Sequence, residues 1–266
     1  MPSLVDKVLI ALMKRSGQDP LINAAKFLEK KNIHYAEENI IPDYRFHDYN
    51  DASTDFLKGI GIQVLADDVD ETLMGFRQKE VHEAFIDTFN DHKQNFRVYI
   101  VSNSGERRYR ELSTMFPDVP VLKMYQTDES DQPINRMLFE NQDILWIWKN
   151  GDQHILYQEP VEFSEEIKKY TTPLNLQKRN ELPKPNPQLN DLIMALEKLD
   201  DPAKIAWIGD RLSAEITTAN QAGATSIWVD QFIDKRNEPS YIKIARRKEA
   251  SLAKKSSILS NLTCST

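Results

Sequence analysis

Short apolar runs alternate with amphipathic stretches through the middle of the chain. The apolar runs are rich in β-branched and aromatic residues and predict strands at 62–66, 97–101, 119–124, 204–208 and 226–229. The amphipathic stretches predict helices at 80–90, 106–115, 188–199 and 216–222. Strands that alternate with helices are typical of α/β proteins, so we expect a doubly wound parallel sheet with helices on both faces.

Three regions fall outside this alternation. Residues 1–39 are interpreted as an N-terminal helical segment, because apolar residues recur there at helical spacing. Residues 125–182 change to polar loops and β-rich runs and are interpreted as an insertion or small cap. Residues 234–266 form a basic C-terminal tail. The core is then made of 40–124 and 183–233.

A hairpin is predicted inside the region 125–182. The pair Asn150-Gly151 lies between the β-rich runs 144–148 and 154–157, and Asn-Gly in that position is a strong signal for a two-residue turn. Trp146 and Trp148 lie on its first strand. Two interpretations are open: these side chains line a substrate entrance or touch lipid, or they pack onto the core, as aromatic residues more often do.

Composition narrows the class of protein. The 266 residues are 40% hydrophobic and 28% charged, which is typical of a globular protein in water. The net charge of −7 argues against nucleic acid as a partner. Cys264 is alone, so no intrachain disulfide is expected. Neither a membrane span nor a secretory signal peptide is evident, so we expect an intracellular protein, cytoplasmic or organellar, that is not secreted.

Charge is distributed unevenly along the chain. Residues 1–35 and 234–266 are each net basic, while the body between them is strongly acidic. Basic ends could give peripheral contact with an anionic membrane. The alternative is a pair of solvated terminal segments.

Carboxylates follow the first predicted strand directly. Asp68 and Asp70 come after the run 62–66, and at spacing i, i+2 in extended chain they point to the same side. Two neighbouring carboxylates can divide the work of nucleophile or metal ligand and of proton transfer. Asp67 is an alternative nucleophile, but its i+2 partner is Val69. The plainer interpretation is an acidic loop.

Polar residues also follow the other predicted strands. Ser102 and Asn103 suit an anionic oxygen, or they cap the helix that follows. Lys184 lies between two prolines, which fix where its ammonium is presented. Asp210, with Glu215 after it, repeats the strand-end carboxylate of Asp68. Ligands of doubly wound sheets collect at this edge, so we expect these side chains to share one site.

This ordered set resembles the haloacid dehalogenase superfamily of phosphohydrolases, whose core is a Rossmann-like sheet. The motifs, in chain order, are Asp68-Val69-Asp70-Glu71-Thr72, Ser102-Asn103, Lys184-Pro185 and Gly209-Asp210-Arg211-Leu212. Within the superfamily the chain is similar to the YqeG-type branch, which includes phosphatidylglycerophosphate phosphatases. The resemblance covers residues 40–124 and 183–232, not 125–182. The chain departs from the pattern at Glu215, where Asp is usual, at Asp67, where an apolar residue is usual, and at Ser104, where Asn is frequent.

The resemblance implies Mg²⁺-dependent hydrolysis of a phosphate monoester through an aspartyl-phosphate. Asp68 would be the nucleophile and Asp70 the general acid and base, with Lys184 offsetting the developing charge. The remaining roles are as follows: Thr72, Ser102, Asn103 and Lys184 bind the phosphate; Asp68, Asp210 and the backbone carbonyl of Asp70 bind Mg²⁺; Glu215, holding a metal-bound water, and Arg211 support them.

The substrate implied by the resemblance is phosphatidylglycerophosphate, a phospholipid. Two alternatives stay open. In the first, the same chemistry acts on a soluble sugar, nucleotide or protein phosphate. In the second, the chain is a non-catalytic member that binds phosphate or a partner.

Overall fold

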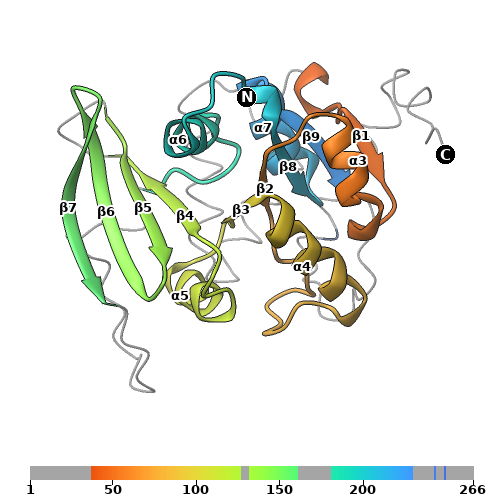
Figure 1. Cartoon of the computed structure of the whole chain (residues 1–266), viewed down its shortest axis with the longest axis horizontal. Helices are drawn as coiled ribbons and strands as arrows, with labels where there is room; N and C mark the ends of the chain where they lie inside the picture. The colour runs from red at the N-terminus through yellow and green to blue at the C-terminus, as the bar shows by residue number, and fades with distance from the viewer. Residues whose placement is uncertain (1–36, 127–131, 161–180, 230–242, 244–248, 250–266) are drawn as a thin grey trace.

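The computed structural model describes residues 37–126, 132–160 and 181–229, together with Lys243 and Glu249 (Figure 1). Residues 1–36 of the predicted helical segment 1–39 therefore lie outside the described residues, as does nearly all of the basic tail. Across the described ranges, nine strands form one sheet in the order β1-β9-β8-β2-β3-β4-β5-β6-β7.

The strands are β1 (Tyr44–Phe46), β2 (Val64–Asp67), β3 (Arg97–Val101), β4 (Val121–Tyr125), β5 (Ile134–Phe139), β6 (Gln142–Lys149), β7 (Asp152–Pro160), β8 (Ile205–Gly209) and β9 (Thr225–Val229). The longer helices are α3 (Thr54–Gly59), α4 (Ile86–Asn95), α5 (Glu106–Met115), α6 (Gln188–Glu197) and α7 (Thr217–Ala222). The short helical turns are η1 (Glu37–Ile40), η2 (Tyr49–Asp51), η3 (Glu83–Phe85), η6 (Pro202–Lys204) and η7 (Leu212–Ile216), the last of which is a π-helix.

Helices cover both faces of the sheet, which confirms the predicted doubly wound α/β fold. The six strands from β1 to β4 pair in parallel. On one face, α3, α4 and α5 pack through Leu57, Phe89 and Leu112. On the other face, α6 and α7 pack through Leu192 and Ala219. Because both faces of the sheet are covered, β2, β8 and β4 have no exposed residue, and their charged residues, Asp67 and Lys123, are buried.

Three antiparallel strands extend this sheet beyond β4. The predicted hairpin is present as β6 and β7, and β5, which the sequence pattern did not predict, joins it to β4. Figure 1 shows these strands fanning out at one end of the sheet. Trp146 is fully buried in the core and Trp148 packs against it. The packing interpretation of the tryptophans is therefore correct, and the apolar residues that the hairpin exposes are Ile155 and Leu156.

One predicted helix begins later than expected. The pattern at 80–90 predicts a helix, but 83–85 forms the 3₁₀ turn η3 and α4 starts at Ile86. Val81, Phe85 and Phe89 face the core as predicted, whereas Ala84 is exposed. The strand β1 was also missed, because three residues are too few to show a period. No helix in the described ranges is long and apolar enough to cross a membrane.

The strand order gathers the predicted site residues. The strand β2 lies between β3 and β8 and runs parallel to both. Their carboxyl ends therefore meet at one edge of the sheet, where Asp68, Ser102 and Asp210 follow them directly.

Candidate active site

Lys184 connects three segments at this edge. Its ammonium lies 2.6 Å from Oδ1 of Asp68 and also donates to the backbone carbonyl of Val101 at the end of β3. It forms a further ion pair with Oε1 of Glu215 in η7. Lys184 is only 2% exposed, so these contacts are shielded from solvent. The backbone fixes Asp68 as well, because its N–H donates to the carbonyl of Ile208 in β8 at 2.9 Å.

Burial changes the titration of the two carboxylates that contact Lys184. Burial raises the pKa of Asp68 to about 6, because the opposing attraction of Lys184 is partly cancelled by the charge of Asp210. Burial also raises the pKa of Glu215, again against the attraction of Lys184. Burial alone would lower the pKa of Lys184, but the two carboxylates raise it, so the ammonium stays charged. The site therefore carries more acidic than basic charge.

A glycine at the end of β8 makes room for Glu215. A Cβ atom at Gly209 would lie 2.3 Å from Cγ of Glu215, so the glutamate side chain rests directly against the strand backbone. The N–H of Arg211 donates to Oε2 of Glu215 at 3.2 Å, while Oε1 contacts Lys184. The longer side chain at this position thus reaches back over the strand end to meet Lys184.

Asp70 has a different set of partners from Asp68. The strand β2 ends at Asp67, so both carboxylates lie on the segment that follows the strand. Oδ1 of Asp70 accepts from Nη2 of Arg108 at 2.7 Å and from the N–H of Arg77 at 2.9 Å. The charge of Asp70 still contributes to the raised pKa of Asp68. The two carboxylates are therefore near enough to interact, but their partners in the described residues differ: Lys184 for Asp68, Arg108 and Arg77 for Asp70.

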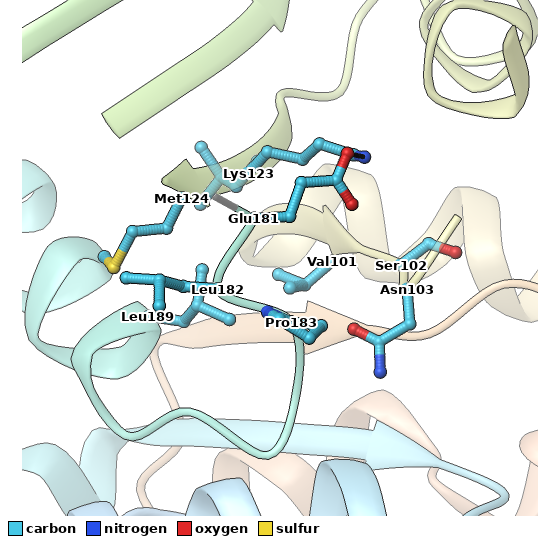
Figure 2. A pocket seen from close by; sticks show the side chains of 10 residues that line it. Val101, Ser102, Asn103, Lys123, Met124, Glu181, Leu182, Pro183 and Leu189 are labelled. Carbon is cyan, nitrogen blue, oxygen red and sulfur yellow. Dashed lines mark hydrogen bonds and ion pairs between the residues drawn. The ribbon is translucent and has the colours of Figure 1, made fainter. Parts of the chain in front are cut away.

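The other predicted phosphate contacts lie around this pair. Thr72 is buried, and its hydroxyl is 3.5 Å from Oδ1 of Asp210. Asn103 and Lys184 bond reciprocally: the amide of Asn103 donates to the carbonyl of Lys184 at 2.8 Å and accepts from its N–H at 2.7 Å. Ser102 is half-buried and lines a small pocket beside them (Figure 2). The side chain of Asn103 thus holds the backbone of Lys184 in place.

Asp67 is placed away from this cluster. Its carboxylate is fully buried and lies 2.7 Å from the hydroxyl of Tyr49. That contact lies behind the strand end, so the alternative of Asp67 as nucleophile gains no support from the geometry.

The residues at the edge fit a magnesium ion. Within the described ranges, no group of three or more His, Cys, Asp or Glu side chains is arranged to hold a metal by itself. The predicted set, however, needs only the carboxylates of Asp68 and Asp210 and the backbone carbonyl of Asp70. All three donors are oxygens, and Mg²⁺ is usually held by one or two carboxylates with several waters. The surplus of buried acidic charge is the observation that favours a cation here.

Sequence reasoning missed several residues that hold this site together. Arg108 on Asp70 and Glu249 on Arg211 each act across 38 residues of chain. Lys123 contacts Glu181, three residues before Lys184. For Lys123, a charged residue inside an otherwise apolar strand was a signal in the sequence. For Arg108 and Glu249 the sequence held no comparable signal.

Comparison with known proteins points to the same family. A family model described as mitochondrial PGP phosphatase matches residues 152–234, which is less than half of the chain. The match confirms the predicted resemblance over that part. It includes Lys184, Asp210 and Glu215, and it begins at β7, earlier than the predicted limit of the resemblance at 183. No curated protein matches the chain.

Two solved structures are similar at a low level. An uncharacterized protein from Listeria monocytogenes serotype 4b is 14% identical, with a TM-score of 0.36 and coverage of 73% of this chain and 99% of the other. An N-terminal truncated, IMP-bound IMP-nucleotidase from Plasmodium falciparum is 11% identical, with a TM-score of 0.32 and coverage of 73% and 70%. At these TM-scores neither likeness supports a conclusion about this chain.

Proposed function

We propose that the chain is a magnesium-dependent phosphomonoester hydrolase of haloacid dehalogenase type that works through a phosphorylated Asp68. The buried cluster of Asp68, Lys184 and Glu215, with Asp210 beside it, is the observation that carries the proposal. It sets a nucleophilic carboxylate next to a cation that can neutralise phosphate. The family match over 152–234 supports a phosphatase.

In the first step, a carboxylate oxygen of Asp68 attacks phosphorus, and the bond from phosphorus to the leaving oxygen breaks. Asp70 donates a proton to that oxygen as it leaves. The hydroxyl of Ser102 and the ammonium of Lys184 contact the phosphoryl oxygens and offset their charge. Since Arg108 holds Oδ1 of Asp70, we assign the proton transfer to Oδ2.

In the second step, Asp70 takes a proton from a water molecule whose oxygen attacks the same phosphorus. The bond between phosphorus and Asp68 breaks, inorganic phosphate leaves and the carboxylate of Asp68 is restored. Asp68, Asp210 and the backbone carbonyl of Asp70 would hold Mg²⁺, which would supply positive charge to offset the repulsion between the anionic nucleophile and the anionic phosphate. Two displacements of this kind replace one direct attack by water on a phosphate monoester.

The substrate that we rank first is phosphatidylglycerophosphate. The support is the description of the matched family, together with the sequence resemblance to the same branch. A phospholipid substrate would bring the protein to a membrane surface, so organellar location and peripheral contact with anionic lipid belong to the same proposal. A salt-sensitive association with anionic vesicles is the result that would support that contact.

The test is phosphate release from phosphatidylglycerophosphate in mixed micelles, measured with Mg²⁺ and with EDTA. We expect metal-dependent release that Asp68→Asn lowers by about 10³-fold or more, because the variant lacks the nucleophile. The matched control is Asp118→Asn, which removes an exposed carboxylate that pairs with Lys93 at the surface. The control should keep full activity.

The possible outcomes test the proposed substrate and the proposed mechanism separately. Release from an aryl phosphate but not from the lipid, still lost in Asp68→Asn, would retain the mechanism and move the substrate to a soluble phosphate ester. No release from either donor would contradict the proposal and favour a binding protein.

A further inference from the structure

A buried lysine outside the catalytic cluster contacts both loops that carry the predicted phosphate contacts. Lys123 lies in the middle of β4 and is 6% exposed. Its ammonium donates to the backbone carbonyl of Ser104 at 2.6 Å and to Oε1 of Glu181 at 2.8 Å. Ser104 belongs to the loop after β3, and Glu181 leads into Lys184. One ammonium therefore joins the two loops.

The backbone explains why a link is needed there. The pairing of β3 with β4 stops at Val101 and Leu122. Beyond that point β4 stays paired with β5, and on its other edge the segment of Glu181 takes the place of β3, with the N–H of Leu182 donating to the carbonyl of Met124 at 2.8 Å. The Lys184 segment is thus fastened to β4 by its backbone. The loop after β3 has left the sheet. It is held by the bonds between Asn103 and the Lys184 backbone and, at Ser104, by Lys123.

The two loops are joined by the reciprocal hydrogen bonds of Asn103 and Lys184, and a pocket lies between them beside that contact. Figure 2 shows it between Ser102 and Asn103 on one side and Leu182 and Pro183 on the other, with Lys123 and Glu181 meeting at its rim. Its volume is about 20 Å³, enough for about one water molecule. Polar contacts, and not close packing, therefore set the distance between the loops.

Packing alone does not require charge at this position. The neighbours of Lys123 along β4 are apolar and buried. A buried ion pair costs desolvation, and replacing both partners by apolar residues of similar volume is often neutral or stabilising. The desolvation cost of this ion pair is offset by a contact that apolar groups cannot make, the hydrogen bond from Lys123 to the carbonyl of Ser104.

We propose that Lys123 and Glu181 are a positioning pair that fixes the loop of Ser102–Ser104 against the Lys184 segment, so that Ser102 and Lys184 reach one phosphate group together. This inference rests on the proposed function for its consequence. The pair touches neither substrate nor reacting atoms. It acts through the geometry of the two loops.

The test replaces both partners, in the double variant Lys123→Met and Glu181→Met. Both changes keep an unbranched side chain of similar volume and remove its charge, so we expect a melting temperature within about 3 °C of the wild type. Hydrogen exchange of peptides covering 102–105 should become faster, because the carbonyl of Ser104 is no longer held. The kcat/KM for an aryl phosphate should fall by about tenfold or more, and the inhibition constant of inorganic phosphate should rise with it.

The matched control is Lys204→Met with Asp200→Asn, which removes an exposed ion pair remote from the loops and should change neither exchange nor kinetics. Unchanged exchange at 102–105 in the double variant would overturn the proposal, whatever the activity. Faster exchange with full kcat/KM and an unchanged phosphate inhibition constant would overturn its functional part. Because exchange is measured without substrate, it tests the pair even if the wild type proves inactive, a result that would count against the proposed function alone.

Discussion

Tyr49, Asp67 and His92 form a buried hydrogen-bonded chain directly behind the candidate nucleophile. The hydroxyl of Tyr49 lies 2.7 Å from Oδ2 of Asp67 and 2.8 Å from Nδ1 of His92. Nε2 of His92 lies 2.7 Å from the carbonyl of Ala52, which can only accept, so Nε2 carries the proton. Burial lowers the pKa of His92, which leaves Nδ1 an acceptor.

Counting protons assigns the state of Asp67. The single hydroxyl proton of Tyr49 cannot serve both Nδ1 of His92 and an ionised Asp67. The hydroxyl of Tyr49 donates to Oδ2 of Asp67, so protonation of Asp67 releases that hydroxyl proton to Nδ1 of His92. The titration agrees: burial raises the pKa of Asp67 to about 7, with a further rise from Asp68, although the bond to Tyr49 acts against it.

Stability should therefore depend on pH through Asp67. Its pKa is higher in the folded chain than the ordinary 3.8, so folding takes up a proton between pH 3.8 and about 7, and the free energy of unfolding falls as pH rises through that window. We expect Asp67→Asn to be more stable than the wild type at pH 8, by up to about 4 kcal/mol, and to show a flatter dependence on pH. Urea unfolding at pH 5 to 8 measures both.

Asp118→Asn is the control, since an exposed aspartate should leave the pH dependence as it is. Some slope should remain in Asp67→Asn, because the pKa of Asp68 is also raised. A slope equal to that of the wild type would mean that Asp67 is ionised in the folded chain and that the proton count is wrong.

At the scale of elements, the local sequence pattern predicted a strand or helix correctly where its conformation does not depend on which other element packs against it. The strand β3 and the helix α5 have the predicted bounds, because a buried parallel strand and an amphipathic helix each show their environment in their own sequence. β5 was missed because Asn135 and Arg136 interrupt its apolar pattern. Arg136 is fully buried by ion pairs with Glu106 and Asp143, and no local pattern shows those partners.

The residues of the candidate site likewise divide into those that the local sequence predicts and those that only the tertiary structure shows. Asp68, Ser102 and Asp210 could be predicted, since each follows a strand and the carboxyl ends of parallel strands share an edge. The direction of each side chain could not. Asp70 turns to Arg108 because α5 packs beside the loop after β2, and that contact depends on tertiary structure. Which residues orient the catalytic groups is therefore visible only in the folded chain.

The junction of β8 with η7 depends on the absence of a side chain at Gly209. A Cβ there would meet the side chain of Glu215 at 2.3 Å, so Gly209→Ala should push Glu215 away from Lys184. We expect kcat/KM to fall by about 10²-fold, because misplacement of a catalytic group by an ångström can cost that much. Steady-state kinetics over a range of Mg²⁺ concentrations is the measurement.

Gly59→Ala provides the comparison. A Cβ at Gly59 meets no atom within 4 Å, and the residue ends a helix without a positive φ, so the variant should fold and turn over normally. Wild-type kinetics in Gly209→Ala would show that the contact between Glu215 and Lys184 is unnecessary for the reaction.

At the scale of the whole molecule, one residue of the C-terminal region is part of the site's support. Glu249 is 6% exposed and accepts from Nε and Nη2 of Arg211, at 3.1 and 2.9 Å, and from the N–H and hydroxyl of Ser213. Arg211 follows Asp210 directly, and its N–H holds Glu215. A residue far along the chain thus fastens the loop that carries two of the predicted metal-site residues. Truncation of residues 234–266 would remove this contact together with the basic charge of the tail.

Glu249→Ala should accordingly weaken the site from a distance. With Arg211 released, the loop of Asp210 is less fixed, and we expect the Mg²⁺ concentration for half-maximal activity to rise by about tenfold, as is usual when support behind a metal ligand is lost. Glu249→Gln, which keeps acceptors for Arg211 and Ser213, should recover part of the loss. Lys243→Ala changes an exposed residue of the same region and is the control.

The indole N–H of Trp228 donates to the carbonyl of Asp210 at 3.0 Å, so tryptophan fluorescence during a Mg²⁺ titration follows the loop without turnover. Identical titration curves for Glu249→Ala and the wild type would mean that this contact holds the C-terminal region in place and has no part in the site.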